Sequence, residues 1–407
     1  MIGLWNDTEA AAFGEGLGLR IYASRLLGRV PSLVLYGGGN TSVKQDDMLF
    51  VKASGSDLAC VNESGFCAVR LPVARRLLER DGLTNSEMMR LLAACVVQHP
   101  KRQPSIETLM HAILPYRYVE HTHADSVLAV INTENAERIA ADVYGPLAPL
   151  VPYRHSGAEL ARTCLRTLEE KAAGETIGLL LRFHGVVAFG DTARASYENM
   201  IRLVTLAEDY LKANGAWHLE TSNGPSGVSA QTVPRAFHAD ATRFAHWPLV
   251  VRQIRGPVAA AFARRDDLAV VSQRGPSTPQ HAVHTKRVPQ LGWDVESYAA
   301  RYTEYLVRAL GREALASIDP APRIVIDPNA GVFALGVDDE SARVAADFYV
   351  HDMEVMMRAS AHDRYLSAPE QAIARAELEY GGFERKIREQ ANRRGESGIN
   401  ERQGHAP

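Results

Sequence analysis

The chain has 407 residues, of which 46% are hydrophobic and 23% charged. With 31 glycines and 20 prolines, this composition is typical of a globular protein and excludes collagen-like, low-complexity and largely disordered classes. The 45 basic and 48 acidic residues leave a net charge of −3, so no basic excess points to nucleic acid or to an anionic membrane. The length predicts two domains.

The sequence shows neither a membrane span nor a secretory signal. No apolar run reaches the roughly 18 residues that a spanning helix needs, and the first residues lack a basic segment followed by an apolar one. The cysteines form no CxxC pair, which favours reduced thiols packed in the core of a cytoplasmic protein. They are Cys60, Cys67, Cys95 and Cys164.

In the first half of the chain, alternating and helical patterns predict the following elements. A helix runs from Asp7 or Thr8 to about Leu27, and a strand covers 32–36. A second strand starts near residue 48 and ends at Gly55. The stretch from Leu71 to about His99 is predicted to be helical.

The next elements surround the polar residues that carry the chemistry. Residues 118–131 read as a strand running into a helix. Two apolar strands flank a sharp break at His184-Gly185. A long helix follows, capped by Asp191 or Thr192 and ending at Gly215.

Residues 221–234 are rich in Ser, Gly, Thr and Pro and indicate a linker. We therefore predict a domain over 1–222, a linker over 223–234, an α/β region over 235–391 and a disordered tail over 392–407. Within the second region we expect a strand at 267–273, a loop at 277–287, a helix at 294–310, two strands within 323–336, and helices to about Gln390.

The strongest chemical signal is His121-Thr122-His123. Residues i and i+2 of a strand point to the same face, so these two imidazoles can converge on one divalent metal ion. Three such ligands would leave an open position for a substrate. The alternative is a pair of histidines on a solvated strand face.

Other residues complete a candidate metal site. His184 stands at the end of an apolar strand and offers a third imidazole, although a lone histidine there also fits a core position. Glu107, near the start of a helix, suits the helix dipole and near a metal could ligate it or act as a general base. Asp125 is placed on the strand face of the histidines as an outer partner. His111, four residues after Glu107, is a weaker rival ligand.

A glycine loop precedes these residues. The segment GGGNTS at 37–42 matches neither a Walker loop nor a GxGxxG fingerprint. Its amides and the Asn40, Thr41 and Ser42 side chains could form an anion-binding nest, to which Ser54-Gly55 would add donors. Each segment taken alone also fits an ordinary turn.

Together these motifs resemble the class II aldolase/adducin family. The matching residues, which follow the family's order and rough spacing, are Gly39-Asn40-Thr41-Ser42, Ser54-Gly55, Pro104-Ser105-Ile106-Glu107, His121-Thr122-His123-Ala124-Asp125 and His184-Gly185. The resemblance covers about residues 10–220. It is strongest to the branch of bifunctional rhamnulose-1-phosphate aldolase/alcohol dehydrogenases, whose middle part residues 235–390 also resemble. The chain ends where the dehydrogenase domain of that branch would begin and has no Rossmann glycine motif, so we expect no nicotinamide chemistry.

The resemblance implies a three-layer α/β/α sandwich on a largely antiparallel sheet, assembled as a cyclic homotetramer. It implies that His121, His123 and His184 hold Zn²⁺, with manganese, iron or cobalt left open. Glu107 would be the general base, and Asn40, Thr41, Ser54 and Gly55 would hold a substrate phosphate. Tyr144 is the candidate for a phenol that reaches a neighbouring subunit's site.

One departure concerns the phosphate. The family often has two serines before the glutamate, where this chain has Ser105-Ile106. The substrate is then unphosphorylated, or another cation compensates for the missing hydroxyl. The candidate cations are Lys44, Lys52 and the Lys286-Arg287 pair.

The two halves of the chain share a short internal similarity. Phe183–Gly190 (FHGVVAFG) aligns without gaps on Asn329–Gly336 (NAGVFALG), and both segments precede a capped helix. We hypothesise that the second region contains a degenerate aldolase-like half with Ala330 at the position of the histidine; chance likeness of two strand–turn–strand units is the alternative. This half would serve as a structural partner or as a lid that brings in His281, His284 or Lys286. A similar strand-then-glycine pairing is predicted between 48–55 and 268–275.

These features favour a Zn²⁺-dependent lyase that cleaves a ketose 1-phosphate, with rhamnulose 1-phosphate as the favoured substrate. A sugar-phosphate epimerase, dehydratase or decarboxylase would use the same metal ligands. A non-catalytic, adducin-like binding module is a further alternative, but adducin-like chains have lost the metal histidines that are present here.

Overall fold

A computed structural model gives the fold and describes residues 1–80, 82, 84–98, 102–219, 221, 233–379 and 381. The chain divides into two compact units. The first comprises residues 1–219 and 354–366, and the second 220–353 and 367–407. Most of the predicted linker and the whole predicted tail lie outside the described residues, so the predicted domain boundaries stay a prediction. Across the described part of the chain, no helix is long and apolar enough to cross a membrane.

The first unit is built on an eight-stranded sheet in the order β4-β3-β2-β1-β5-β8-β7-β6. All neighbouring strands are antiparallel except β6 and β7, which confirms the predicted largely antiparallel sheet. The strands are β1 (Asn40–Gln45), β2 (Met48–Lys52), β3 (Phe66–Arg70), β4 (Val96–Gln98), β5 (Tyr118–Thr122), β6 (Leu150–Val151), β7 (Gly178–Leu181) and β8 (Gly185–Gly190).

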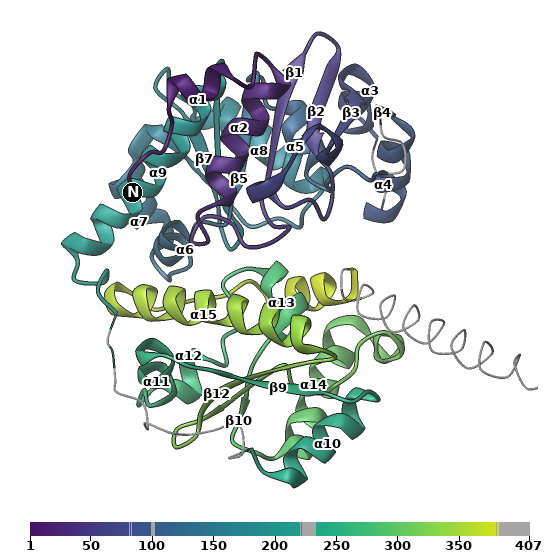
Figure 1. Cartoon of the computed structure of the whole chain (residues 1–407), viewed down its shortest axis with the longest axis vertical. Helices are drawn as coiled ribbons and strands as arrows, with labels where there is room; N and C mark the ends of the chain where they lie inside the picture. Colours follow the sequence, from purple (N-terminus) through teal and green to yellow (C-terminus); the bar gives the residue numbers. More distant parts are fainter. Residues whose placement is uncertain are drawn as a thin grey trace, which may run out of the picture. The chain divides into compact units, whose positions relative to one another are not determined.

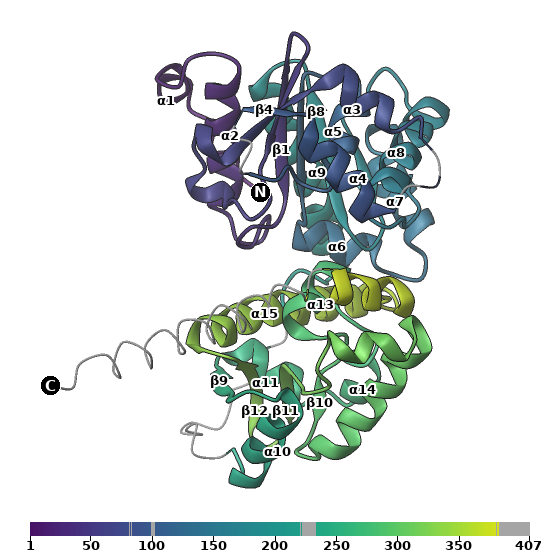
Figure 2. The same ribbon diagram turned by 90° about the vertical axis from the view of Figure 1, so that its right-hand side faces the viewer.

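Helices cover both faces of this sheet, which gives the predicted three layers (Figures 1 and 2). One face packs against α3 (Leu71–Leu77), α4 (Asn85–Ala94), α5 (Thr108–Ile113) and α8 (Ala158–Lys171). The other packs against α2 (Leu17–Gly28), α6 (Asp125–Ile131), α7 (Ala136–Tyr144) and α9 (Ala193–Ala213), with α1 (Asp7–Ala11) near the N-terminus. Val119 and Val187 belong to the core under α5 and α8, so residues in alternation with them point to that layer.

Three predictions for the first unit are wrong in detail. The first helix is divided into α1 and α2, and its cap is Asn6, because Gly14 and Gly16 adopt positive φ between them. Residues 32–36 form a turn and not a strand; the Leu33 and Val34 amides both bond back to the Val30 carbonyl.

The third concerns the predicted helix over residues 71–99. In place of one helix, this stretch contains the separate helices α3 and α4 and the edge strand β4, and Gly82 between the helices has φ +74°.

The second unit has a four-stranded sheet in the order β10-β11-β12-β9. Its strands are β9 (Val250–Ile254), β10 (Gln290–Leu291), β11 (Ile324–Asp327) and β12 (Gly331–Gly336). Its helices are α10 (Arg235–Ala245), α11 (Pro257–Ala263), α12 (Leu268–Val271), α13 (Pro279–Thr285) and α14 (Val295–Leu310), and residues 370–379 are helical. It also contains the first part of α15 (Asp339–His362), whose residues from Glu354 onward belong to the first unit. α10 and α14 share a core with β11 and β12.

This sheet repeats half of the first one. The order β9-β12-β11-β10 corresponds to β5-β8-β7-β6: in each, the first three strands are antiparallel neighbours and the last pair is parallel. A helix lies between the parallel strands, α14 in one case and α8 in the other, and a long helix follows the last hairpin. The hypothesis of an aldolase-like second half is therefore confirmed at the level of strand order.

The register shows which residues of the second unit stand at the positions of the three candidate ligand histidines. His121 pairs with Val187, two residues after Gly185, and Gln253 pairs with Phe333, two residues after Gly331. Gln253 and Arg255 thus stand where the first unit has His121 and His123, and Ala330 stands where it has His184. The equivalent site in the second unit lacks imidazole ligands and cannot hold a metal in the same way.

Two predictions for the second unit are wrong. Residues 268–271 form α12 and not a strand, and Pro279–Thr285 form α13 and not a loop. The predicted structural similarity between residues 48–55 and residues 268–275 is therefore wrong as well. Thr278 caps α13 and Pro279 is its first residue, a start signal that the abundance of polar residues obscured.

The strand-end glycines make a testable contact in both units. A Cβ on Gly336 would lie 2.2 Å from the amide nitrogen of Ala342, and a Cβ on Gly190 would lie 2.9 Å from the amide nitrogen of Ser196. In both cases the contacted residue is six positions later, at the start of the following helix. We expect Gly336→Ala to destabilise the second unit by about 1–3 kcal/mol, because backbone must move. Hydrogen exchange of β12 and α15 measures this. Gly174→Ala, with open space at Cβ, is the control; equal protection in the two variants would contradict the prediction.

Candidate metal centre

The three predicted histidines come together in the first unit. His121 lies on β5, His123 follows the end of that strand, and His184 lies in the turn between β7 and β8. One ring nitrogen from each lies within 4.8 Å of the others, and the Nε2 atoms of His121 and His123 are 3.1 Å apart. Gly185 makes this approach possible, since a Cβ there would lie 2.2 Å from the Thr122 carbonyl oxygen.

A backbone contact fixes the protonation of His121. Its Nδ1–H donates to the Val186 carbonyl at 3.0 Å, so Nε2 carries the lone pair and faces the other rings. The side chain is fully buried, and burial lowers its pKa to about 4, which keeps the imidazole neutral at physiological pH. A neutral, oriented imidazole is the form that binds a metal.

Glu107 lies directly beside these rings. It is the residue before α5 rather than within its first turn, and it is 5% exposed. Its Oε1 is 2.8 Å from His184 Nε2 and its Oε2 is 3.5 Å from His121 Nε2. Burial alone raises the pKa of Glu107, but His121, His184 and the Asn40 amide outweigh burial and leave the pKa well below its ordinary value. The carboxylate is therefore ionised.

His111 has a different role from the rival ligand predicted for it. The Asn40 amide donates to Glu107 Oε2, and the Asn40 carbonyl oxygen accepts from His111 Nε2. The other ring nitrogen of His111 accepts from Ser42 Oγ at 2.7 Å. Burial lowers the pKa of His111 to about 3, in line with a neutral ring. Both nitrogens are occupied, so His111 positions Asn40 and, through it, Glu107.

The four predicted phosphate-binding residues separate into two groups. Asn40 and Thr41 are buried; Asn40 bonds Glu107 and His111, and Thr41 Oγ1 lies 2.8 Å from Ser24 Oγ on the opposite face of the sheet. Thr41 therefore has no hydroxyl to offer at the histidines. Ser54 and Gly55 are exposed, and Gly55 packs against Gly37 of the glycine loop.

Lys52 joins the two glycine segments. Its side chain is 2% exposed, and its ammonium donates to the carbonyl oxygens of Gly37 at 2.7 Å and Ser56 at 2.6 Å. Burial lowers its pKa to about 8, partly opposed by the negative charges of Asp57 and Glu107. Of the predicted cations, Lys44 instead donates to the Tyr116 carbonyl at 2.6 Å, and burial lowers its pKa to about 7.

Two predicted residues lie differently from what the sequence indicated. Asp125 is not on the strand, because β5 ends at Thr122; it is the first residue of α6, and its amide donates to the Ser32 carbonyl. Tyr144, at the end of α7, is 2% exposed, its hydroxyl has no hydrogen-bond partner within the described residues, and burial raises its pKa far above the ordinary value. A buried phenol is poorly placed to reach another subunit.

The residues predicted to act as a lid all belong to the second unit. His281 is buried, and its Nδ1 lies 2.8 Å from the Asp352 carboxylate. The His284 ring stacks on Phe348 at 4.4 Å, and Lys286 follows α13 in the left-handed region. Their role as a lid stays a prediction. Among the thiols, Cys67, Cys95 and Cys164 are buried as expected, but Cys60 is exposed.

The donor set fits a divalent ion. Three clustered imidazoles with an adjacent carboxylate are typical zinc ligands, and a cation among them would resolve the close approach of the nitrogen lone pairs. The fold and this centre define an α/β/α domain with a candidate metal site, in a chain whose second unit repeats part of the domain's sheet.

Comparisons with protein families identify that class. The model described as Class II Aldolase and Adducin N-terminal domain matches residues 20–211, and the one described as Aldolase class II, second domain matches residues 229–386. The chain belongs to the class II aldolase/adducin family, as the resemblance predicted.

Solved and curated proteins are similar to parts of this chain. The N-terminal class II aldolase domain of a conserved protein from Thermoplasma acidophilum is 34% identical, covering 52% of this chain and 99% of that one, with a TM-score of 0.47. L-fuculose-1-phosphate aldolase from Thermus thermophilus is 20% identical over 48% of this chain and 95% of its own, with a TM-score of 0.33. The uncharacterized oxidoreductase YuxG of Bacillus subtilis (strain 168) is 28% identical over 408 residues; the alignment covers 90% of this chain and 58% of that relative's length.

Proposed function

We propose that the chain is a zinc-dependent lyase that cleaves a ketose 1-phosphate into dihydroxyacetone phosphate and an aldehyde. Rhamnulose 1-phosphate is the favoured substrate, from the resemblance of residues 10–220 to that branch of the family. The observation that carries the proposal is the cluster of His121, His123 and His184, in which His121 is fully buried and His184 partly exposed, with an ionised Glu107 against it.

His121, His123 and His184 would hold the metal. A divalent ion bound there supplies Lewis-acid stabilisation of the negative charge that develops on the substrate's oxygens. The protein contributes the orientation of the ligands, because the Val186 carbonyl fixes the His121 ring. The burial of His121 and Glu107 strengthens the electrostatic interactions that these two side chains make.

Glu107 would carry the proton. In the cleavage direction the hydroxyl on the fourth carbon gives up its proton and becomes the aldehyde carbonyl while the bond between the third and fourth carbons breaks. The electron pair of that bond remains with the three-carbon ketone, whose third carbon must then gain a proton. We assign delivery of that proton, and its removal in the reverse direction, to Glu107. The bonds from Asn40, supported by His111, hold the carboxylate in one orientation.

The glycine loop, Ser54 and Gly55 would bind the phosphate. Lys52 supports this proposal, since it bonds both segments and an ammonium carries three donors. Its third N–H and its charge would compensate for the serine that the chain lacks before Glu107.

Lys52→Met is expected to raise KM for the phosphorylated substrate by about 10- to 100-fold, because a charge-assisted hydrogen bond contributes about 1.5–3 kcal/mol. An unphosphorylated ketose should be affected much less. Steady-state kinetics with both substrates measure the difference. Lys44→Met, at a partly buried lysine whose ammonium donates to the Tyr116 carbonyl, is the matched control. An equal rise in KM for both substrates would contradict the proposal that Lys52 binds the phosphate.

The proposed function is tested with the full chain loaded with Zn²⁺ and supplied with rhamnulose 1-phosphate. Release of dihydroxyacetone phosphate is followed by coupled oxidation of NADH. Release that a chelator abolishes and zinc restores supports the proposal. Protein that binds metal but releases no product excludes this substrate, and the epimerase, dehydratase and decarboxylase reactions are then assayed. Protein unable to take up metal indicates an adducin-like binding module.

The assembly is proposed from the family resemblance. We propose a cyclic homotetramer with active sites between subunits. Light scattering of the purified chain measures its mass directly, and a monomeric mass in an active preparation would exclude sites shared between subunits.

A further inference from the structure

The hydrogen-bonding positions of Asn40 are all used inside the protein. Its amide nitrogen donates to Glu107 Oε2 and to Ser105 Oγ, the latter at 3.4 Å. Its carbonyl oxygen accepts from His111 Nε2. A side-chain amide has two donors, and both have partners here. Asn40 therefore has no donor left for a substrate phosphate, which is the role that the family resemblance implies for it.

The Glu107 carboxylate sets the direction of every hydrogen bond in this group. An ionised carboxylate accepts and cannot donate, so the nitrogen of the Asn40 amide faces Glu107 and its oxygen faces His111. His111 Nε2 must then carry the proton of the ring, and Nδ1 carries the lone pair. Ser42 Oγ lies 2.7 Å from Nδ1 and must donate to it. The Ser42 hydroxyl thus fixes the tautomer of His111.

The sheet places these side chains on the face that carries the histidine cluster. Asn40 and Ser42 are two residues apart on β1, so they point to the same side, and Asn40 is the register partner of His121 on β5. His111 comes from α5. Asn40 is 4% exposed, and Ser42 and His111 are fully buried. A polar network at this depth is stable only when each member is hydrogen-bonded, as each one is here.

The other tautomer of His111 would disrupt this network. With the proton on Nδ1, the bare Nε2 would face the Asn40 carbonyl oxygen, and two acceptors repel each other. If the Asn40 amide turned over to relieve this contact, its oxygen would face the Glu107 carboxylate, which is again a pair of acceptors. Ser42 therefore acts on Glu107 through two intervening side chains.

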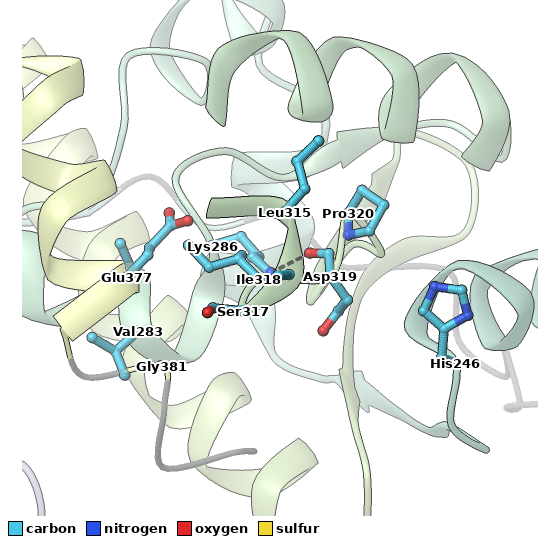
Figure 3. Close-up of a pocket in the computed structure, with 12 residues that line it drawn as sticks. His246, Val283, Lys286, Leu315, Ser317, Ile318, Asp319, Pro320, Glu377 and Gly381 are labelled. Atoms are coloured by element: carbon cyan, nitrogen blue, oxygen red, sulfur yellow. Dashed lines mark hydrogen bonds between the residues drawn. The ribbon is translucent and has the colours of Figure 1, made fainter. Parts of the chain in front are cut away.

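Other groups remain available for the phosphate. Lys52 donates to the carbonyl oxygens of Gly37 and Ser56, in the two glycine segments. Lys286, another cation predicted for the phosphate, lies in the wall of a cavity within the second unit, where its ammonium donates to the Asp319 carbonyl oxygen (Figure 3). Assigning Asn40 to Glu107 thus leaves the phosphate to Lys52 and the glycine segments.

We propose that Ser42, His111 and Asn40 form a positioning network for the Glu107 carboxylate, and that Asn40 does not bind the substrate phosphate. This inference rests on the proposed lyase reaction and deepens it. The network would hold Glu107 in the orientation from which it delivers a proton to the third carbon of the substrate. Ser42 and His111 would be positioning residues, since they act only through Asn40.

Steady-state kinetics of the full chain, loaded with Zn²⁺ and supplied with rhamnulose 1-phosphate, test the assignment of Asn40. Asn40→Ala should lower kcat by about 10- to 100-fold, because the carboxylate loses its support. KM should stay nearly unchanged, since a group that acts on the carboxylate alone adds no binding energy in the ground state. A rise in KM with kcat preserved would identify Asn40 as a phosphate ligand and overturn the proposal.

A double-mutant cycle tests the role of Ser42. Ser42→Ala should lower kcat by about tenfold, because His111 then also populates the other tautomer. His111→Gln retains an amide that can donate to Asn40 and has no tautomers, so adding Ser42→Ala to it should lower kcat no further. Thr163→Ala removes a buried hydroxyl from α8 and is the control, with unchanged kcat. An equal cost of Ser42→Ala in both backgrounds would show a purely structural hydroxyl and overturn the proposal.

Two-bond ¹H–¹⁵N correlation spectra of the full chain, labelled with ¹⁵N-histidine, report the tautomer without any substrate. The His111 signals are assigned by their loss in His111→Gln. The native chain should carry the proton on Nε2, and Ser42→Ala should alter this pattern; a proton on Nδ1 in the native chain would overturn the proposal. If the chain releases no product from rhamnulose 1-phosphate, the proposed substrate fails, whereas the spectra still decide whether the network exists. They also decide, with the cycle, if circular dichroism shows that Asn40→Ala does not fold.

Discussion

Replacing Glu107 by glutamine is expected to lower the rate of ketose phosphate cleavage by about 10²- to 10⁴-fold, the usual contribution of a positioned acid–base group. The variant keeps the shape of the side chain but removes the charge that His184 and Asn40 stabilise. Bound metal should be retained, since the three imidazoles remain. Single-turnover rates, together with metal content by mass spectrometry, measure both quantities on the same preparation.

The metal content distinguishes between two possible roles of Glu107, acid–base catalysis and metal ligation. A carboxylate 2.8 Å from His184 Nε2 can act on the substrate or complete the ligand set. Loss of metal in parallel with activity would identify Glu107 as a ligand and contradict the acid–base assignment. Glu198→Gln, at an exposed glutamate paired with Arg194, is the control and should change neither quantity.

The clustering of the three candidate metal ligands could be predicted because the position of each depends on local chain geometry. His121 and His123 share a face through the period of two of an extended strand, and His184 is held by a glycine turn between two apolar strands. The hairpin that ends at Gly336 was predictable for the same reason. The internal similarity also led to the expectation that the second sheet repeats part of the strand order of the first.

The residues that support Glu107 could not be predicted in this way. His111 and Asn40 are 71 positions apart, and only the folded sheet and α5 bring them into contact. The i, i+4 spacing of Glu107 and His111 signalled a shared helix face but not which partner each side chain takes. Thr41 was assigned to the phosphate from its motif, whereas strand alternation directs it to Ser24 on the other face.

The short apolar runs were misassigned for a different reason. Residues 32–36 and 268–271 are each apolar enough for a buried strand, and periodicity alone cannot distinguish such a run from a turn or a short helix. In the structure, the first is held by bonds to Val30 and the second forms one helical turn after Asp267. In both cases local backbone hydrogen bonds to a residue three or four positions earlier take the place of strand pairing.

The buried ion pair of Arg20 and Glu120 lies on the face of the sheet opposite the histidines. Glu120 alternates with His121 and points to the layer of α2 and α9, where Arg20 Nη2 lies 2.7 Å from it and Ser196 donates at 2.9 Å. Both charged side chains are fully buried, and Arg20 Nη1 and Glu120 Oε2 have no hydrogen-bond partner within the described residues. We expect Arg20→Met alone to destabilise the first unit by about 3–5 kcal/mol, because it leaves an unpaired buried carboxylate.

Replacing both partners, Arg20→Met with Glu120→Leu, should recover much of that loss, since no buried charge then remains. Hydrogen exchange of peptides from β5 and α2 reports the opening free energy of the first unit separately from that of the second. Arg138→Met breaks a pair with Asp142 in which both side chains are more than 60% exposed, and should cost less than about 0.5 kcal/mol. If Arg20→Met costs no more than this control, water reaches the pair and the burial argument fails. Because Glu120 faces away from the histidines, the double variant should still bind metal, which would separate the stability of the sheet from the chemistry on its other face.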